Sequence, residues 1–171
     1  MQDDEAVRSC RDGHQEAFQH LVRRYQQRAL AHARALTGND ADAADAAQDA
    51  FVDAFKNIDR FDTGQEFYPW FYVLLRNRCF KQRTRRATRP ESGELPERAT
   101  STNASPEQVL DLRAALDRLD RPDRELILLK HVDGWTYDEL ASRLEIPRGT
   151  VMSRLFTARR RLQNVLSGAE R

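Results

Sequence analysis

Residues 136–161 decide the fold, and they read Thr136-Tyr-Asp-Glu-Leu-Ala-Ser-Arg-Leu-Glu-Ile-Pro-Arg-Gly-Thr-Val-Met-Ser-Arg-Leu-Phe-Thr-Ala-Arg-Arg-Arg161. Thr136 and Glu139 have the spacing of a capping box, in which a hydroxyl and a carboxylate bind the free N–H groups at the start of a helix. Pro147 lacks an N–H and disfavours helical angles at Ile146, so we expect this helix to end before the proline. A second helix restarts near Arg148. Two helices joined by a tight turn predict a helix-turn-helix.

The apolar residues of this stretch agree with such a motif. In the first helix three of them share one face: Leu140, Ala141 and Leu144. In the second helix the residues spaced to face inward are Val151, Leu155, Ala158 and Leu162. The small side chain of Ala141 would let the two helices approach closely where they cross.

The second helix of the motif is strongly basic. No acidic residue occurs between Glu145 and Glu170, and the helix carries Arg148, Arg154, Arg159, Arg160 and Arg161. Such a helix can lie in the major groove, with its first turns near base edges and its arginines near phosphates. The alternative is a solvated basic face on an ordinary helical hairpin. Because the capping box, the turn and the single sign of charge coincide, the sequence favours DNA binding.

Charge is segregated along the chain. The 171 residues are 40% hydrophobic and 32% charged, which allows one domain or two small ones with modest cores. The net charge of only +1 hides one acidic and two basic surfaces, one of the basic ones being the helix that begins near Arg148. The acidic segment contains Asp40, Asp42, Asp45, Asp49, Asp53, Asp59 and Asp62, and the other basic segment contains Arg76, Arg78, Lys81, Arg83, Arg85, Arg86 and Arg89. Separate surfaces of opposite charge suggest different partners for each.

Several classes of protein are disfavoured by the same composition. No apolar run is long enough to span a bilayer and no signal peptide is evident, so we expect no membrane insertion. The only cysteines, Cys10 and Cys79, are best explained as reduced thiols in the cytoplasm. Cys10 and His14 lack a second ligand pair nearby, so no metal site is predicted. We find no catalytic constellation and no cofactor motif, and we do not expect an enzyme.

The first half of the chain is predicted to be helical. One helix is expected over residues 3–35, ended by Gly38 and Asn39, and a second is expected to be capped by Asp40 and to run to about Ile58. The second helix should bury Ala47, Phe51, Ala54, Phe55 and Ile58. Another face carries Asp45, Gln48, Asp49 and Asp53. This acidic stripe could serve solubility or dock a basic partner, and its spacing does not decide between them.

An aromatic helix follows a short loop over residues 61–66. Pro69 is tolerated because it lies in the first turn. The residues expected to form core are Phe67, Trp70, Phe71 and Leu74. Tyr68 and Tyr72 are predicted to lie off that face, where aromatic rings beside a basic run could stack on unpaired bases.

The helical pattern fails over residues 87–105, which are rich in Pro, Ser and Thr and predict a flexible interdomain linker. Ser105 begins another capping box, and the next helix should bury Val109, Leu112, Leu116 and Leu119. Pro122 begins a helix that Gly134 closes, with Leu126, Ile127, Leu129 and Val132 inward. The sequence therefore predicts an all-α protein of two small helical domains, residues 1–86 and 106–171, the second containing the helix-turn-helix.

These motifs, in this order, resemble one family. Asp45-Ala-Ala-Gln-Asp-Ala-Phe, then Phe61 and Phe67-Tyr-Pro-Trp-Phe-Tyr with the Arg-Asn that follows, resemble sigma region two. Leu119-Asp-Arg-Pro-Asp-Arg-Glu, Trp135-Thr-Tyr-Asp-Glu-Leu-Ala and Gly149-Thr-Val-Met-Ser-Arg-Leu resemble sigma region four. Both regions occur in the bacterial extracytoplasmic-function (ECF) sigma factors. The resemblance covers nearly the whole chain, and the ordered pair of regions is highly specific.

The resemblance implies a transcription initiation subunit with three contact sites. Docking to the clamp coiled coil of the large catalytic subunit of RNA polymerase would use Asp45, Gln48, Asp49, Phe51 and Asp53. The −10 element, with one base flipped out, would be bound by Phe61, Phe67, Tyr68, Tyr72, Arg76, Asn77, Arg83, Arg85 and Arg86. The −35 duplex would be read by Arg148, Thr150, Ser153, Arg154, Phe156 and Arg159. Met152 departs from the family pattern, which commonly has Lys or Arg there.

The family also implies control by a separate anti-sigma factor. The main rival is a stand-alone helix-turn-helix regulator that binds duplex DNA without polymerase. A third possibility, an adaptor that binds only proteins, would leave the two basic clusters unexplained. The acidic helix and the aromatic helix favour the sigma factor, because a simple repressor needs neither.

Overall fold

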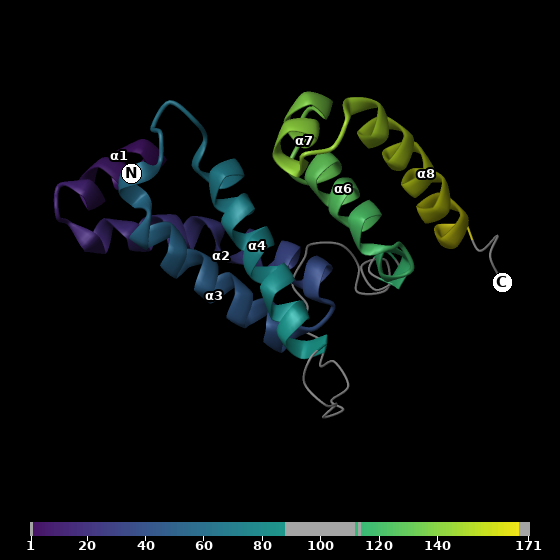
Figure 1. The fold of residues 1–171 in the computed structure, drawn as a ribbon, viewed down its shortest axis with the longest axis horizontal. Coiled ribbons are helices and arrows are strands. Elements are labelled where there is room, and N and C mark those ends of the chain that lie inside the picture. The colour runs from purple at the N-terminus through teal and green to yellow at the C-terminus, as the bar shows by residue number, and fades with distance from the viewer. Residues whose placement is uncertain (1, 88–111, 113, 168–171) are drawn as a thin grey trace. The chain divides into compact units, whose positions relative to one another are not determined.

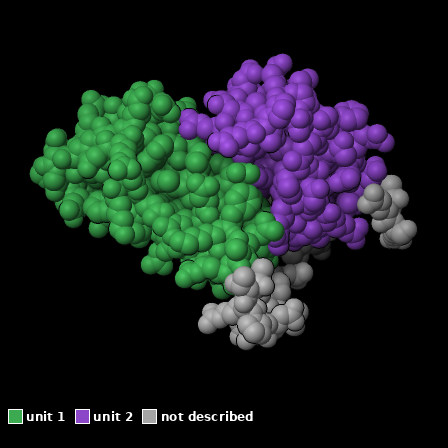
Figure 2. Space-filling model, viewed as in Figure 1, with its two compact units in different colours: residues 1–96 green, residues 97–171 purple. Residues whose placement is uncertain are grey.

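The computed structural model describes residues 2–87, 112 and 114–167, and every regular element in these ranges is helical (Figure 1). The chain forms two compact units, residues 1–96 and 97–171 (Figure 2). An all-α architecture with two helical units confirms the predicted fold class. The expected linker after residue 87, the capping box at Ser105 and Val109 lie outside the described residues.

The described part of unit 1, residues 2–87, contains four α-helices and two short 3-10 turns. These are α1 (Asp3–Arg11), η1 (Gln15–Ala17), α2 (Phe18–Thr37), α3 (Asp40–Lys56), η2 (Ile58–Arg60) and α4 (Phe67–Ala87). The single helix predicted over residues 3–35 is wrong. Gly13 has a φ of 96°, in the left-handed region that favours glycine, and it ends α1. Helices α2, α3 and α4 pack against one another to enclose the core (Figure 1).

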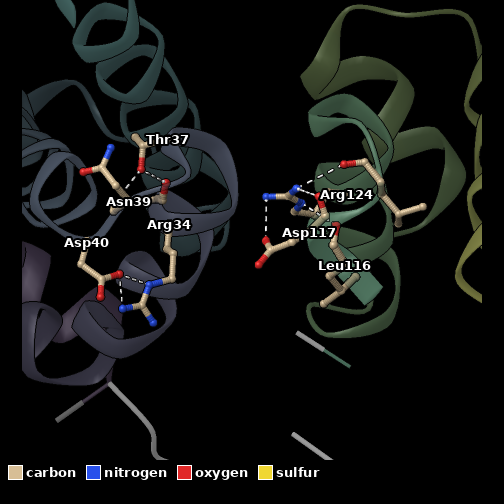
Figure 3. Close-up of polar contacts among 9 residues, drawn as sticks. Arg34, Thr37, Asn39, Asp40, Leu116, Asp117 and Arg124 are labelled. Atoms are coloured by element: carbon tan, nitrogen blue, oxygen red, sulfur yellow. Dashed lines mark hydrogen bonds and ion pairs between the residues drawn. The ribbon is translucent and has the colours of Figure 1, made fainter. Parts of the chain in front are cut away.

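The junction of α2 and α3 shows how local residues set the helix ends. Gly38 ends α2 with a φ of 87°, as expected. Asn39, not Asp40, caps α3, since its side-chain oxygen accepts a hydrogen bond from the Asp42 N–H at 2.8 Å. Asp40 lies inside the first turn and is bonded to Arg34 of α2 (Figure 3). The Asp40 carboxylate therefore ties the two helices together.

The core of unit 1 is aromatic, and it differs from the prediction at two tyrosines. Tyr68 and Tyr72 were expected off the buried face, but both are buried. The ring centroids of Tyr25 and Tyr68 lie 5.2 Å apart, and those of His32 and Tyr72 lie 5.1 Å apart. Because α4 packs against both α2 and α3, it buries two faces instead of one. Among the four expected core residues, Phe67 and Phe71 are buried, while Trp70 and Leu74 are partly exposed.

Unit 2 contains α6 (Arg121–His131), α7 (Tyr137–Leu144) and α8 (Arg148–Leu166), preceded by a helical stretch at residues 114–117. Asp120 caps α6 and Pro122 lies in its first turn. Leu126, Ile127 and Leu129 are buried, as predicted. Val132, the C-cap residue of α6, was also expected inward but is 68% exposed. Leu112 is also exposed, and Ala115 and Leu119 take the buried positions.

A buried guanidinium joins α6 to the helical stretch before it. Arg124 donates hydrogen bonds to the carbonyl oxygens of Leu116 at 2.8 Å, Asp117 at 2.9 Å and Leu119 at 3.2 Å (Figure 3). Carbonyl groups at a helix C-terminus have no partner within their own helix, so a cation there is stabilising. Arg124 is thus fully engaged within unit 2.

The helix-turn-helix has the predicted geometry. Thr136 caps α7 through a capping box with Glu139: the Thr136 N–H donates to Glu139 Oε2 at 2.7 Å, and the Glu139 N–H donates to Thr136 Oγ1 at 3.2 Å. Helix α7 ends at Glu145, which has a φ of 56°, and α8 begins at Arg148 immediately after Pro147. The inner face buries Leu140, Leu144, Val151, Leu155 and Ala158, and leaves Ala141 and Leu162 partly exposed.

Candidate polymerase and nucleic-acid interfaces

The exposed face of α3 (Asp45, Gln48, Asp49 and Val52) carries most of the side chains expected to dock polymerase. Asp45 and Gln48 are exposed, and the Asp49 side chain is half exposed. Phe51 is buried against Phe71, with ring centroids 4.4 Å apart, so its ring faces the core. Val52 was missed from sequence and is 44% exposed. Its position one helical turn after Gln48 could have identified it.

Arg78 of α4 binds two of the acidic residues of α3. It forms a two-nitrogen ion pair with Asp53, and its Nη1 lies 3.5 Å from Asp49 Oδ2. The hydrogen bond from Arg78 lowers the pKa of Asp53 below its usual value. Gln82 Nε2 also lies 3.4 Å from Asp45 Oδ2. The acidic stripe is therefore partly bound inside unit 1, and Asp53 belongs to that internal network.

The four rings assigned to the −10 element are buried. They are Phe61, Phe67, Tyr68 and Tyr72. Phe61 packs on Phe67 and Trp70, with centroid distances of 5.7 and 5.0 Å. These aromatic contacts anchor both ends of the loop of residues 62–66, since Phe61 precedes the loop and Phe67 follows it. The loop itself is largely exposed.

The same loop is held from α1 and by its own backbone. Arg11 donates to the Ile58 carbonyl at 2.9 Å and is also hydrogen-bonded to the Phe61 carbonyl. Asp62 Oδ1 accepts a hydrogen bond from the Gly64 N–H at 2.9 Å, which shapes the turn. The start of the loop is thereby fixed relative to α1.

The polar residues expected to bind the −10 strand lie along α4. Asn77 and Arg85 are exposed, and Arg76 and Arg83 are partly buried. The Arg76 guanidinium lies 4.6 Å from the Phe80 ring centroid. The Arg86 side chain lies outside the described residues. The structure therefore places five of the nine proposed −10 residues on one helix as polar residues: Arg76, Asn77, Arg83, Arg85 and Arg86.

Most of the arginines of α8 have partners within unit 2. Arg148 pairs with Asp138 at 2.9 Å, Arg154 with Asp123 at 3.0 Å, and Arg161 with Asp123 at 3.6 Å. Arg159 donates to His131 Nε2 at 3.0 Å. Burial lowers the pKa of His131, and the charges of Arg159 and Lys130 lower it further, so the ring accepts as neutral imidazole.

The outward face of α8 (Met152, Ser153, Phe156 and Arg160) is less basic than the sequence indicated. Phe156 is 62% exposed and Met152, one turn earlier, is 47% exposed. Ser153 and Arg160 are also exposed, and the Arg160 guanidinium lies 5.9 Å from the Phe156 ring. Thr150 is partly exposed at the start of the helix. An exposed apolar pair beside a polar side chain and a cation suits the chemistry of major-groove base edges.

No helix among the described residues is long and apolar enough to cross a membrane. Within residues 2–87, 112 and 114–167, no cluster of three or more His, Cys, Asp or Glu side chains is suited to hold a metal ion. Cys10 and Cys79 are both buried as free thiols.

The family models that match this chain place both of its helical units in the sigma-factor class. The family model for Sigma-70 region 2 matches residues 21–89, and that for Sigma-70 region 4 matches residues 110–162. Similar proteins include the ECF RNA polymerase sigma factor SigE of Mycolicibacterium smegmatis, 31% identical over 88% of this chain, and the ECF RNA polymerase sigma-E factor of Escherichia coli, 29% identical over 96%. The chain spans 62% of the first relative's length and 94% of the second's.

Two solved structures are also similar. CnrH, determined in complex with the cytosolic domain of CnrY, aligns with a TM-score of 0.71 at 26% identity and 97% coverage of both chains. RpoE of Bartonella quintana, determined in complex with the anti-sigma factor NepR, aligns with a TM-score of 0.70 at 27% identity, covering 90% of this chain and 98% of that one. The chain belongs to the ECF sigma factors, a family of transcription initiation factors and not of enzymes.

Proposed function

We propose that this protein directs RNA polymerase to particular promoters, docking on core polymerase through unit 1 and contacting promoter DNA with both units. One observation carries the proposal: a single chain combines the exposed acidic and apolar face of α3 with an exposed outward face on α8. A protein that only binds duplex DNA requires the second face but not the first. The proposal places the protein in the cytoplasm, with core polymerase.

Docking on polymerase would use the exposed face of α3. Carboxylates at Asp45 and Asp49 suit a basic partner, and Val52 supplies apolar contact at the centre of the patch. The partner we propose is the clamp coiled coil of the large catalytic subunit. Phe51 and Asp53 would act indirectly, since one packs in the core and the other is held by Arg78.

Recognition of the −10 element would use the loop of residues 62–66 together with Arg76, Asn77, Arg83, Arg85 and Arg86 of α4. A flipped base needs a pocket for its edge and neutralisation of the flanking phosphates. The loop would supply the pocket and the arginines the neutralisation. The buried rings Phe61, Phe67, Tyr68 and Tyr72 would support the loop from below instead of stacking on DNA.

Recognition of the −35 element would use the outward face of α8, with Arg148 and Thr150 at its start. Ser153 and Arg160 can bind base edges or phosphates. Met152 and Phe156 offer apolar contact to the C5-methyl group of thymine, the apolar feature of the major groove. We therefore expect thymine to be favoured at one or two base pairs facing these side chains.

Control by a separate anti-sigma factor is part of the proposal. Two structural relatives were solved with protein partners, and one of those partners is described as an anti-sigma factor. One exposed apolar side chain of each unit, Val52 in unit 1 and Phe156 in unit 2, would be covered by such a partner. Purification of this protein from its own cells, followed by identification of stoichiometric partners, would test this point.

The decisive experiment for the proposed function is run-off transcription with core RNA polymerase from the source bacterium on genomic promoter fragments. New starts that require both the polymerase and this protein would establish a sigma factor and yield its −35 and −10 sequences. If no start appears while the protein alone protects duplex DNA, the protein is an independent helix-turn-helix regulator and the proposal is wrong.

A further inference from the structure

A buried carboxylate of α6 lies against α8. Asp123, in the first turn of α6, is only 4% exposed. Its N–H is capped by Asp120 Oδ1 at 3.1 Å, and its carboxylate lies near the positive end of the α6 dipole. A charge removed from water is costly unless it is paired. The pairing partners of Asp123 are therefore informative.

Both partners come from α8. Arg154 approaches with two nitrogens, Nε and Nη2, each 3.0 Å from Asp123 Oδ1. Arg161 Nη1 lies 3.6 Å from the other oxygen, Oδ2, and 4.0 Å from Asp120 Oδ2. Arg154 and Arg161 are seven residues apart, which places them on one side of α8 two turns from each other. One carboxylate thus contacts α8 at two positions that are two helical turns apart.

This arrangement fixes the rotation of α8 about its own axis. The apolar side chains of Val151, Leu155 and Ala158 bury one side of the helix, but apolar packing is not directional. A guanidinium that meets a carboxylate through two nitrogens has a defined orientation. With Arg154 and Arg161 directed at α6, Phe156 and Met152 are turned to solvent. A small rotation of α8 would move every side chain of the outward face together.

We propose that Asp123 is a positioning residue for −35 recognition: it holds Arg154 and Arg161 and so sets which side chains of α8 enter the major groove. Arg154 then acts through Asp123 and does not itself contact a base. This inference rests on the proposed function. It also separates two roles among the arginines of α8, because Arg154 and Arg161 orient the helix while Arg160 remains on the outward face.

The test uses the full-length protein, core polymerase and a promoter recovered by run-off transcription, with each −35 base pair substituted singly. Asp123→Asn keeps the shape of the side chain and removes its charge. We expect Asp123→Asn and Arg154→Ala each to reduce transcription at least about tenfold and to weaken discrimination at several −35 positions at once. The double variant should transcribe as well as the less active of the two single variants, because both changes remove the same contact.

A base-reading Arg154 would behave differently. Arg154→Ala would then lose discrimination at one base pair only, and Asp123→Asn would keep the wild-type profile; either result overturns the proposal. Arg160→Ala is the matched control, since it removes an exposed arginine of the same helix. It should change discrimination or salt dependence locally and should not be coupled to Asp123→Asn.

Two further outcomes can be told apart. If the wild-type protein produces no transcription starts, the proposed function itself is wrong, and the positioning role that rests on it falls with it. If Asp123→Asn does not fold, judged by helical circular dichroism, Arg154→Lys replaces it, because lysine keeps the charge and loses the two-nitrogen contact. Arg154→Lys should give a smaller loss with the same broad pattern, and an unchanged −35 profile would overturn the positioning role.

Discussion

Arg78 determines how much of the acidic stripe is available to a partner. It binds Asp53 with two nitrogens and lies near Asp49, so α4 neutralises part of α3. Arg78→Ala is expected to destabilise unit 1 by about 1.5–3 kcal/mol at pH 7, the usual range for hydrogen bonds to charged groups. The folded pKa of Asp53 is lowered. The stabilisation by the Arg78–Asp53 ion pair is therefore complete above the pKa of Asp53 in the unfolded chain, about 4. It is lost as the pH falls through the pKa of Asp53 in the folded protein.

Urea unfolding followed by circular dichroism, at pH 7 and at a pH below the folded pKa of Asp53, would measure both parts of this prediction. Asn77→Ala, an exposed and uncharged change on the same helix, is the control and should be nearly neutral. Equal destabilisation by Arg78→Ala at both pH values would show that packing, not the ion pair, is responsible.

Sequence spacing predicted which residues face the core of their own unit. It predicted less well which residues of other helices they contact. Val151, Leu155 and Ala158 were expected inward and are buried. Arg154 was expected to face DNA, yet its partner Asp123 lies 31 residues earlier in the chain. Tyr72 was expected outside because one face of α4 sufficed for the core, whereas two helices cover it. Such long-range pairings depend on how helices pack, which periodicity does not contain.

Helix α7 illustrates a signal that is local and therefore predictable. The capping box joins Thr136 and Glu139 within four residues, and the structure has both hydrogen bonds. Thr136→Ala is expected to destabilise α7 by about 1 kcal/mol, the typical loss for an N-cap hydroxyl. Amide hydrogen exchange should accelerate in the first turns of α7, with Thr136→Ser as the control that keeps the hydroxyl. Unchanged exchange in Thr136→Ala would show that tertiary packing alone holds this end.

The turn between α7 and α8 contains the one non-glycine residue with positive φ among residues 2–87, 112 and 114–167. Glu145 has a φ of 56°, a conformation that costs a side-chain-bearing residue about 1–2 kcal/mol. Glu145→Gly should relieve this strain and, after the greater flexibility of the unfolded chain is subtracted, stabilise unit 2 by roughly 0.5–1 kcal/mol. Thermal unfolding would measure the gain. Glu145→Ala is the control, and equal stabilisation by both variants would contradict the role of backbone strain.

Local signals also explain which helix ends were found. Pro147 and Gly38 stop helices by their own backbone chemistry, and both ends were predicted. Gly13 was overlooked because apolar residues continue at helical spacing on both sides of it, although its φ is 96°. The same limitation applies to Asn39 and Asp40, since either side chain can cap a helix and only the structure shows which one does.

At the scale of the whole molecule, the order of two motifs identified the family more surely than any single residue. Each unit carries one half of the signal: the acidic and aromatic helices lie in unit 1, and the helix-turn-helix in unit 2. The site residues were less predictable, because exposure depends on tertiary packing. Four of the proposed −10 residues are buried rings, and Val52 and the positioning role of Asp123 became visible only in three dimensions.

The two exposed faces should be separable by mutation if the protein acts as proposed. Asp49→Arg reverses charge on a half-exposed side chain of α3, and we expect it to abolish association with core polymerase, and hence all transcription, without loss of helical circular dichroism. Phe156→Ala removes a 62% exposed ring from α8, so polymerase should still bind while −35-dependent starts fall about 5- to 150-fold, the equivalent of roughly 1–3 kcal/mol. Asp12→Arg, a charge reversal at an exposed position after α1, is the control for the first variant. Polymerase pull-down and run-off transcription on the same preparations measure both effects. Undiminished pull-down by Asp49→Arg would remove α3 from the docking site, and full transcription by Phe156→Ala would remove the outward face of α8 from promoter recognition.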